Sequence, residues 1–537
     1  MAQETLVSGE VRQVTRAAAL ISIGNVSSRA LGLLREMAKS YFFGAGGAVS
    51  AFDVAAQVPT MLYDLLVGGM LSSALVPVFS DYMHPERRWE LWQLVSLLLS
   101  LLTLSLGALV LLIEIAAPVV ARLLGAGLDA TYLVLATQMI RITTPAILFL
   151  NVAGLLSGVL YVQQRFKRPA FLGAVSNATL VIVVVLLGRS ALGARSLAVG
   201  LLVGSLVQVL FQLGALEYTR LRFVLPRLNH PALRTIGALY LPIGLGLIVD
   251  QLAVGLSFNL ASRIGPSGIA WMKYAATVIQ FPLGMVVTAI SIAILPTLSR
   301  YANEAKDARF RATLAQGLRL VLLLILPAAT LMLVLAEPLV ALLFQRGNFM
   351  AQDTQAVALA LRFNLPGLIF AALDQLLIFA FYARKDTWTP AMVGVLTTAV
   401  YALLAFLPTL FGRLTLSLLI LANSLKLGVH ALFMFSRFVR RVGSLHRYGL
   451  VPTATRALGA SAAMIPFVLL GSWGARQLGW TGLEGVLLEV STASGLGILV
   501  YLGLLRHMGL EELKFLQKAV VRRLNRKEDL SEENDSR

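Results

Sequence analysis

The stretch WQLVSLLLSLLTLSLGALVLLIEIAAPVVA, residues 92–121, contains a single ionisable side chain, that of Glu114. About 20 apolar residues of helix cross a bilayer core of ~30 Å, so this stretch is long enough to span a membrane. It lacks the period-two alternation of a barrel strand, and it therefore predicts a transmembrane helix.

Comparable stretches lie on both sides of this one. A first group lies at 17–40, 51–78, 92–121, 132–160, 170–188 and 196–217. A second group lies at 236–260, 272–296, 315–343, 354–382, 390–411 and 415–436, and a final pair at 456–474 and 484–505. The sequence therefore predicts an all-α polytopic membrane protein with about 14 transmembrane helices.

The composition fits a chain whose solvent is largely lipid. Hydrophobic residues make up 58% and charged residues 13%, and the mean hydropathy is +0.79. The basic residues behind the net charge of +18 are scattered in short clusters, which argues against nucleic acid as a partner. The chain has no cysteine, so disulfides and thiolate chemistry are excluded. Charged residues in the first apolar run also argue against a cleaved leader.

Lysine and arginine are distributed unevenly between alternate loops. One set of loops, which includes both termini, holds 29 of these residues, and the alternate set holds 7. Cytoplasmic loops accumulate positive charge, so we expect both termini in the cytoplasm.

The chain repeats itself at a period near 220 residues. A P-x-x-S-x-Y motif occurs at residues 77–82 and again at 296–301, an offset of 219. Further matches occur at offsets of 220 and 221, and they pair Pro118 with Pro338 and Tyr161 with Tyr382. Because each unit holds six spans, the halves should run in the same sense and enclose a cavity between two lobes.

The repeat predicts four regions. They are an N-lobe at 1–220, a C-lobe at 221–440, helices thirteen and fourteen within 441–510, and a cytoplasmic amphipathic and charged tail at 511–537.

Several ionisable residues lie at predicted membrane depth, where they indicate a functional site. The first helix has Arg29, Arg35, Glu36 and Lys39. For the last two or three of these, the alternatives are extension to the interface and local pairing.

Two further helices carry polar side chains along one face. They include Asp53, Gln57, Thr60 and Asp64 on the second helix and Lys273, Thr277 and Gln280 on the eighth. These spacings of three and four residues place each set on one side of its helix, where it could line a water-filled cavity. Hydrogen bonding between helices is the alternative for the neutral members.

Asp250 and Asp374 are two further acids that we expect to be buried, each able to bind a coupling cation or proton or to pair with a nearby base. The histidines show no metal-binding spacing, and no phosphate-binding G-x-x-x-x-G-K-[ST] motif occurs. The sequence therefore predicts no cofactor, no metal site, no catalytic residue and no enzyme.

A series of short motifs in order along the chain resembles the MurJ/MviN lipid II flippase family of the multidrug/oligosaccharidyl-lipid/polysaccharide exporter superfamily. The first half carries S-R-x-L-G-x-x-R-E at 28–36, F-G-A-G at 43–46, A-L-V-P at 74–77, R-I-T-x-P at 141–145 and R-F-x-x-P-A at 165–170. The second half carries W-x-x-Y-A at 271–275, Q-F-P at 280–282, L-F-Q-R-G-x-F at 343–349 and F-Y-A-R-x-D-T-x-T-P at 381–390.

The resemblance implies a transporter of the bacterial cytoplasmic membrane that moves the peptidoglycan precursor lipid II by alternating access. It implies a role in cell-wall synthesis and cell shape, with the lipid bilayer, a polyprenyl-pyrophosphate glycolipid and the cell-wall synthesis machinery as partners. Arg29 and Arg35 match the family's cavity cations, and cations suit a pyrophosphate. Na⁺, H⁺ and the membrane potential are the candidate driving forces.

The chain departs from the family pattern at Ser50, Tyr63, Gly68 and Thr277. We hypothesise that Lys273, one turn before Thr277 and on its face, supplies a missing charge, and that Asp53 and Asp64 replace absent acids. The substrate-binding candidates are thus Arg29, Arg35, Lys273, Asp53, Gln57, Asp64, Thr277 and Gln280.

A second hypothesis is a cation-coupled exporter of another lipid-linked oligosaccharide or of a small amphiphile on the same fold. Such a site would depend on acids such as Asp53, Asp64 and Asp250 rather than on arginines.

Overall fold

The computed structural model describes residues 2–68, 74–83, 86, 88–216, 221–224 and 229–509. All regular structure in these residues is helical, and twelve helices are long and apolar enough to cross a membrane. The twelve run from Trp89–Leu124 to Gly482–His507 and correspond in order to the third through fourteenth predicted spans. The all-α fold class is confirmed, while the predicted tail at 511–537 lies outside the described residues.

The described residues of the first two predicted spans are also helical, but these spans are not among the twelve. Helix α1 (Ala2–Phe43) contains the predicted span 17–40, and its charged residues lower its hydropathy. Helix α2 (Gly47–Tyr63) has only 17 residues before it continues as the π-helical segment Asp64–Gly68, and α3 (Val76–Ser80) follows. That these two spans cross the bilayer stays a prediction.

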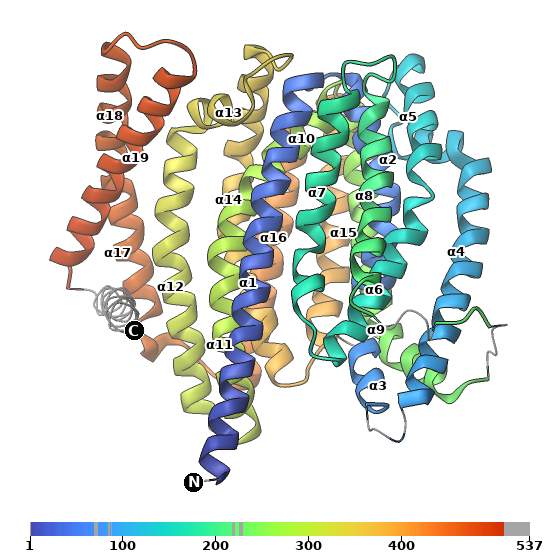
Figure 1. The fold of residues 1–537 in the computed structure, drawn as a ribbon. Coiled ribbons are helices and arrows are strands. Elements are labelled where there is room, and N and C mark those ends of the chain that lie inside the picture. The colour runs from blue at the N-terminus through green and yellow to red at the C-terminus, as the bar shows by residue number, and fades with distance from the viewer. Residues whose placement is uncertain are drawn as a thin grey trace, which may run out of the picture. The chain divides into compact units, whose positions relative to one another are not determined.

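The larger of two compact units comprises residues 1–285, 343–367 and 386–430. Within it α1 packs along α7 and α7 along α8, as Figure 1 shows. Besides α1 to α3, its helices are α4 (Arg88–Leu124), α5 (Ala130–Thr143), α6 (Ala146–Val162), α7 (Lys167–Leu187), α8 (Arg195–Leu213), α9 (Pro231–Ser262), α10 (Gly268–Pro282) and α15 (Trp388–Leu410).

The smaller unit comprises residues 286–342, 368–385 and 431–537. It contains α11 (Thr288–Asn303), α12 (Asp307–Val334), α17 (Leu450–Ala463), α18 (Ile465–Gln477) and α19 (Gly482–His507), and most of α13 (Ala336–Phe344). Helices α14 (Ala351–Ala383) and α16 (Leu416–Val442) contribute to both units. The predicted division at residues 220 and 440 stays a prediction.

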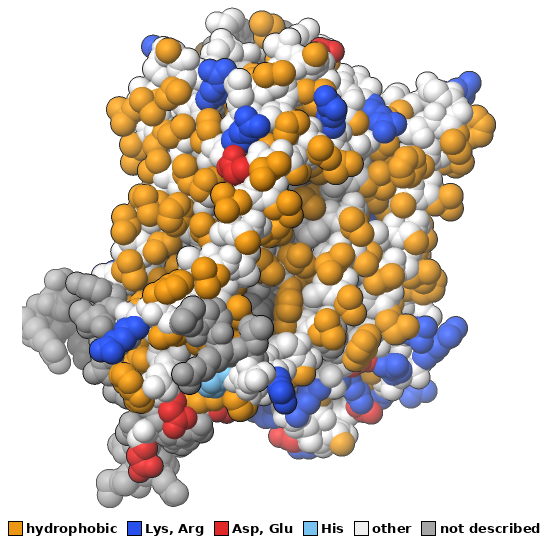
Figure 2. Space-filling view, turned by 90° about the vertical axis from the view of Figure 1, so that its right-hand side faces the viewer, with side chains coloured by type: hydrophobic (Ala, Val, Ile, Leu, Met, Phe, Trp, Pro, Cys, Tyr) orange, Lys and Arg blue, Asp and Glu red, His pale blue; other side chains and the backbone are white. Residues whose placement is uncertain are grey.

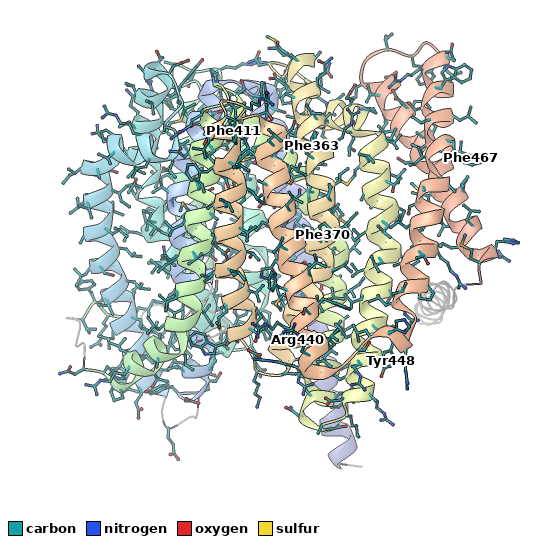
Figure 3. The ribbon with its side chains drawn as sticks, turned by 180° about the vertical axis from the view of Figure 1, so that it is seen from behind. Phe363, Phe370, Phe411, Arg440, Tyr448 and Phe467 are labelled. Atoms are coloured by element: carbon teal, nitrogen blue, oxygen red, sulfur yellow. The ribbon has the colours of Figure 1, made fainter. Side chains whose placement is uncertain are left out.

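Helices α18 and α19 form a hairpin in the smaller unit. The Arg476 Nη2 atom lies 2.7 Å from Glu489 Oε1, and the Ser472 hydroxyl donates to the same oxygen at 2.6 Å. Phe467 on α18 is 42% exposed, and Figure 3 labels it at the edge of this hairpin. The pair is therefore joined by a buried acid and presents apolar side chains to its surroundings.

Prolines divide two of the predicted spans. The span at 132–160 consists of α5 and α6, with Pro145 at the N-cap of α6. The span at 456–474 likewise consists of α17 and α18, with Pro466 in the first turn of α18. Proline has no N–H to donate, so it is tolerated at a helix start and interrupts a helix interior.

Large apolar side chains are exposed along the spanning helices. Ile115 is 80% exposed, Leu186 is 72% and Leu410 is 78%. Figure 2 shows hydrophobic side chains over much of the face in view, with Lys and Arg gathered toward two ends. A surface of this kind suits contact with lipid, since monomeric soluble proteins rarely expose large contiguous apolar areas.

A π-helical segment occurs at the same place in each half of the repeat. The first is Asp64–Gly68, after α2, and the second is Leu283–Val287, after α10. Their starting residues differ by 219, which is the offset of the P-x-x-S-x-Y motif. This shared irregularity of the backbone supports the predicted duplication, because π-helix is rare.

The turn between α1 and α2 brings their side chains together. Gly44 has a φ of +68°, a conformation that favours glycine, and its N–H donates to the Ser40 carbonyl oxygen at 2.8 Å. A Cβ at this position would lie 2.5 Å from the Asn348 carbonyl oxygen, so a side chain would not fit. The reversal places Asp53 of α2 beside Lys39 of α1.

Candidate functional site

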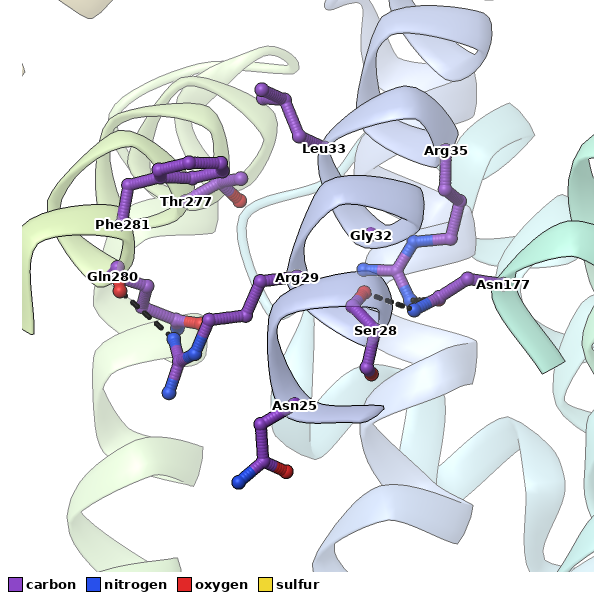
Figure 4. A pocket seen from close by; sticks show the side chains of 10 residues that line it. All are labelled: Asn25, Ser28, Arg29, Gly32, Leu33, Arg35, Asn177, Thr277, Gln280 and Phe281. Atoms are coloured by element: carbon purple, nitrogen blue, oxygen red, sulfur yellow. Dashed lines mark hydrogen bonds between the residues drawn. The ribbon is translucent and has the colours of Figure 1, made fainter. Parts of the chain in front are cut away.

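A pocket of about 360 Å³ lies in the larger unit between α1, α7 and α10. It brings together arginine, amide and hydroxyl groups, as Figure 4 shows. The lining residues are Asn25, Ser28, Arg29, Gly32, Leu33 and Arg35 of α1, Asn177 of α7, and Thr277, Gln280 and Phe281 of α10. Helix α10 comes from the second half of the predicted repeat, so both halves contribute to the walls.

Helix α1 presents these groups because they recur every three or four residues. Asn25, Arg29, Gly32 and Arg35 follow this spacing and therefore share one side of the helix. Small residues allow α7 to approach closely: a Cβ on Gly173 would lie 2.2 Å from the Ser28 Oγ atom. The pocket thus has a tightly packed helix pair as one wall.

Arg29 reaches across the pocket from α1 to α10. Its Nη1 atom donates to the Gln280 carbonyl oxygen at 2.8 Å, and Figure 4 shows the guanidinium directed toward that helix. No carboxylate pairs with Arg29 among the residues that the structure describes. A guanidinium carries five N–H donors, so most of those of Arg29 remain available to a ligand.

Arg35 is held more firmly than Arg29. Its Nε and Nη2 atoms donate to Glu36 Oε1 at 3.1 and 2.7 Å, and its Nη1 atom donates to Asn177 Oδ1 at 3.0 Å. The Asn177 amide in turn donates to the Ser28 carbonyl oxygen at 3.1 Å. Arg35 is still 38% exposed, so it is both fixed in position and accessible from the pocket.

Behind the pocket wall lies a buried cluster of charges formed by Glu36, Lys39 and Asp53. The Lys39 Nζ atom lies 2.6 Å from Glu36 Oε2 and 3.0 Å from Asp53 Oδ1. It also lies 4.7 Å from the centre of the Tyr274 ring. Lys39 is 1% exposed, so it pairs inside the protein rather than extending to an interface.

The other predicted substrate-binding residues divide into two groups. Thr277 and Gln280 line the pocket, whereas Asp53, Gln57, Asp64 and Lys273 are not among its lining residues. The Lys273 Nζ atom lies 5.7 Å from the centre of the Phe258 ring. The structure therefore does not place Lys273 beside the two arginines in the pocket wall.

The surroundings of Thr277, Gln57 and Asp64 differ. The Thr277 hydroxyl donates to the Lys273 carbonyl oxygen at 3.0 Å, one turn earlier in the same helix. Gln57 is buried, and Asp64 is half-buried at the start of its π-helical segment.

The two ion-coupling candidates lie in different environments. Asp374 is buried at 6% exposure, as expected. The expectation that Asp250 is buried is wrong: its side chain is 53% exposed, and the Lys426 Nζ atom lies 3.6 Å from its Oδ1. Pairing with a nearby base, one of the two alternatives for Asp250, is what the structure shows.

Sequence reasoning missed Asn25 and Asn177 as pocket residues. Each is an amide at predicted membrane depth, and that signal was available in the sequence. The pairing of Asn177 with Arg35 depends on the packing of α1 against α7, which the sequence did not predict.

An all-helical chain with twelve candidate membrane spans among its described residues and a cationic pocket has the features expected of a membrane transporter. A solved structure titled as the inward-facing conformation of a multidrug resistance MATE family transporter of the MOP superfamily matches 79% of this chain and 99% of its own, with a TM-score of 0.66 and 15% identity. A structure of lipid II flippase MurJ in an inward closed conformation covers 90% of this chain and 98% of its own, with a TM-score of 0.76 and 22% identity.

The sequence model of the lipid II flippase MurJ family matches residues 39–480, and the chain belongs to this family of bacterial multi-pass membrane transporters. Lipid II flippase MurJ of Burkholderia cenocepacia is 29% identical and covers 94% of this chain and 99% of its own length. The probable lipid II flippase MurJ of Haemophilus influenzae is 31% identical over 69% of this chain and 76% of its own. The resemblance found in the motifs is therefore confirmed.

Proposed function

We propose that this protein moves lipid II, a polyprenyl diphosphate bearing the peptidoglycan disaccharide-pentapeptide, across the cytoplasmic membrane by alternating access. Membership of the MurJ family supports this cargo. The observation that carries the proposal is that Arg29 and Arg35 line the same pocket. In this reading the two guanidinium groups bind the diphosphate while the prenyl chain stays in the bilayer.

The chemistry of the pocket suits a diphosphate. Arginine binds phosphate oxygens through parallel N–H donors, and such charge-assisted hydrogen bonds are stronger than neutral ones. The amide side chains of Asn25 and Asn177 and the hydroxyl of Ser28 add groups that can hydrogen-bond a sugar.

Lys273 stays a candidate for a third cation that binds the diphosphate. Its ammonium lies over the Phe258 ring rather than in the pocket wall. Because Lys273 does not line the pocket in this structure, we propose that it reaches a bound diphosphate in another conformation of the transport cycle. Lys273→Ala should therefore lower transport more than it lowers binding, and transport equal to wild type would remove Lys273 from the proposal.

The positions of the acids favour this proposal over the cation-coupled exporter of another cargo. That alternative depends on acids in the binding site, but Asp53 pairs with Lys39 and Asp250 lies beside Lys426. Neither of these acids lines the pocket. Asp374 and the membrane potential remain candidates for the driving force, and one charge moved through 100 mV corresponds to about 2.3 kcal/mol.

Complementation tests the function most directly. A cell depleted of its own lipid II flippase should grow when it expresses this chain and should not grow with Arg29→Ala or Arg35→Ala. Purified variants in nanodiscs should bind undecaprenyl diphosphate roughly tenfold more weakly than wild type, since each loses a charge-assisted hydrogen bond. Arg413→Ala, at an exposed position between α15 and α16, is the matched control. Unchanged binding by both pocket variants would contradict the proposal.

We also propose that both termini face the cytoplasm, and the absence of cysteine makes this simple to test. Lys167 begins α7, Ser190 lies three residues beyond its other end, and both are exposed. A membrane-impermeant maleimide applied to intact cells should label Ser190→Cys and not Lys167→Cys. The reverse pattern would invert the proposed orientation.

A further inference from the structure

The pocket and the buried cluster behind it are joined by one continuous series of charges. Arg35 contacts Glu36, Glu36 contacts Lys39, and Lys39 contacts Asp53, with distances of 2.7, 2.6 and 3.0 Å. The charges alternate in sign along this series. Its positive end, Arg35, is accessible from the pocket, and its negative end, Asp53, is buried on α2.

Glu36 is the link because it divides its two oxygens between the neighbouring cations. Oε1 accepts both hydrogen bonds from Arg35, and Oε2 faces Lys39. The rotation of this carboxylate is therefore determined from both sides. If Lys39 were neutral, Glu36 could turn both oxygens toward Arg35 and draw its guanidinium away from the pocket.

Lys39 is itself held in place on several sides. Asp53 accepts its second ionic contact, and its Nζ atom lies over the rings of Tyr274 at 4.7 Å and Phe52 at 6.0 Å. The Tyr274 hydroxyl donates to the Gly44 carbonyl oxygen at 2.9 Å, which fixes that ring against the turn between α1 and α2. An ammonium this deeply buried is stable only with such partners, so its position is well defined.

We propose that Lys39 and Asp53 are positioning residues that hold Glu36, and through it Arg35, in the orientation that binds the diphosphate of the cargo. The inference rests on the proposed function, because it needs Arg35 to contact that diphosphate. Asp53, a predicted substrate-binding residue, acts in this account through Arg35 without touching the substrate.

A double-mutant cycle on the full chain in nanodiscs, with undecaprenyl diphosphate as the probe, tests the inference. The variants are Arg35→Gln, the charge-neutral double variant Lys39→Met/Asp53→Asn, and the triple variant that combines them. A residue that acts only on stability would weaken binding equally with and without Arg35. A positioning residue has an effect only while Arg35 is present.

We expect the double variant to bind roughly three- to tenfold more weakly than wild type, and the triple variant to match Arg35→Gln within about twofold. Thermal unfolding of each variant establishes that the compared proteins are folded. If the double variant does not fold, Asp53→Asn alone provides the same comparison, since Lys39 then retains Glu36 as a partner.

Failure of the inference is distinguishable from failure of the proposed function. If Arg35→Gln weakens binding and the double variant does not, or if the two effects multiply in the triple variant, Lys39 and Asp53 do not position Arg35. If Arg35→Gln binds as wild type while Arg29→Gln is weakened, the diphosphate site stands and the inference is wrong. If neither arginine matters, the proposed function is wrong as well.

Discussion

Helices α2 and α10 occupy corresponding places in the repeat, yet they contribute different chemistry. Each leads into a five-residue π-helical segment, and the two segments start 219 residues apart. Helix α2 carries Asp53, which faces a buried lysine, whereas α10 carries Thr277 and Gln280 in the pocket wall. The two predicted halves thus share an irregular backbone and differ in the side chains that they present.

The largest difference between the surroundings of α2 and α10 is expected at two lysines. Lys39 packs against α2, and Lys273 lies on α10. Lys39→Met leaves Glu36 and Asp53 buried without their shared cation, and we expect a loss of about 3–5 kcal/mol in the free energy of unfolding. Lys273→Met removes a contact with the Phe258 ring, worth roughly 0.5–1 kcal/mol. Thermal or denaturant unfolding in detergent measures both.

The double variant Lys39→Met/Asp53→Asn is the control for this prediction. It should recover most of the stability lost by Lys39→Met, because it removes an unpaired buried acid. Equal stability of the two single lysine variants would show that α1 and α2 do not depend on the buried cluster.

Two glycines in the π-helical segments provide a matched pair. A Cβ on Gly284 would lie 1.8 Å from Arg29 Cζ, whereas a Cβ on Gly68 would have its nearest neighbour at 3.7 Å. Gly284→Ala should therefore displace the Arg29 side chain and weaken binding of undecaprenyl diphosphate by about tenfold. Gly68→Ala should leave that affinity unchanged within about twofold. Similar affinities for both variants would mean that Arg29 does not bind the probe from its observed position.

Much of the fold was predictable because hydropathy reports directly on the membrane. Runs such as 92–121 leave few alternatives to a spanning helix, and the third through fourteenth predicted spans all have structural counterparts. Hydropathy alone does not mark the first helix as a spanning helix, because its charged residues lower its hydropathy. Two of them, Arg29 and Arg35, line the pocket. The π-helical segments were not predicted, since they change the backbone without an evident change in composition.

The site was only partly predictable, because spacing gives the face of a helix and not its neighbour. The family resemblance marked Arg29 and Arg35 as cavity cations, and both line the pocket. The pattern on α2 could not reveal that Asp53 faces Lys39, since this contact depends on the turn at Gly44. Asp250 was expected to be buried, but the packing of α9 leaves it exposed beside Lys426.

The pair of Asp250 and Lys426 is more exposed than the buried cluster of Glu36, Lys39 and Asp53. Its contribution to stability can therefore be compared with that of the cluster. The two charges are 3.6 Å apart, and the carboxylate is 53% exposed. The contact is longer than those of the buried cluster and one partner is half exposed, so Lys426→Met should cost less than Lys39→Met. Unfolding measurements under the same conditions provide the test, and a loss as large as that of Lys39→Met would contradict it.

The smallest effect is expected at Gln280, although it lines the pocket. Arg29 donates to the backbone carbonyl oxygen of Gln280, and Gln280→Ala retains this acceptor. The variant should therefore bind undecaprenyl diphosphate within about twofold of wild type. Gly284→Ala, assayed alongside, disturbs the same arginine sterically and provides the contrast. A tenfold loss in Gln280→Ala would mean that its side-chain amide binds the ligand, and α10 would then contribute polar recognition as well as an anchor for Arg29.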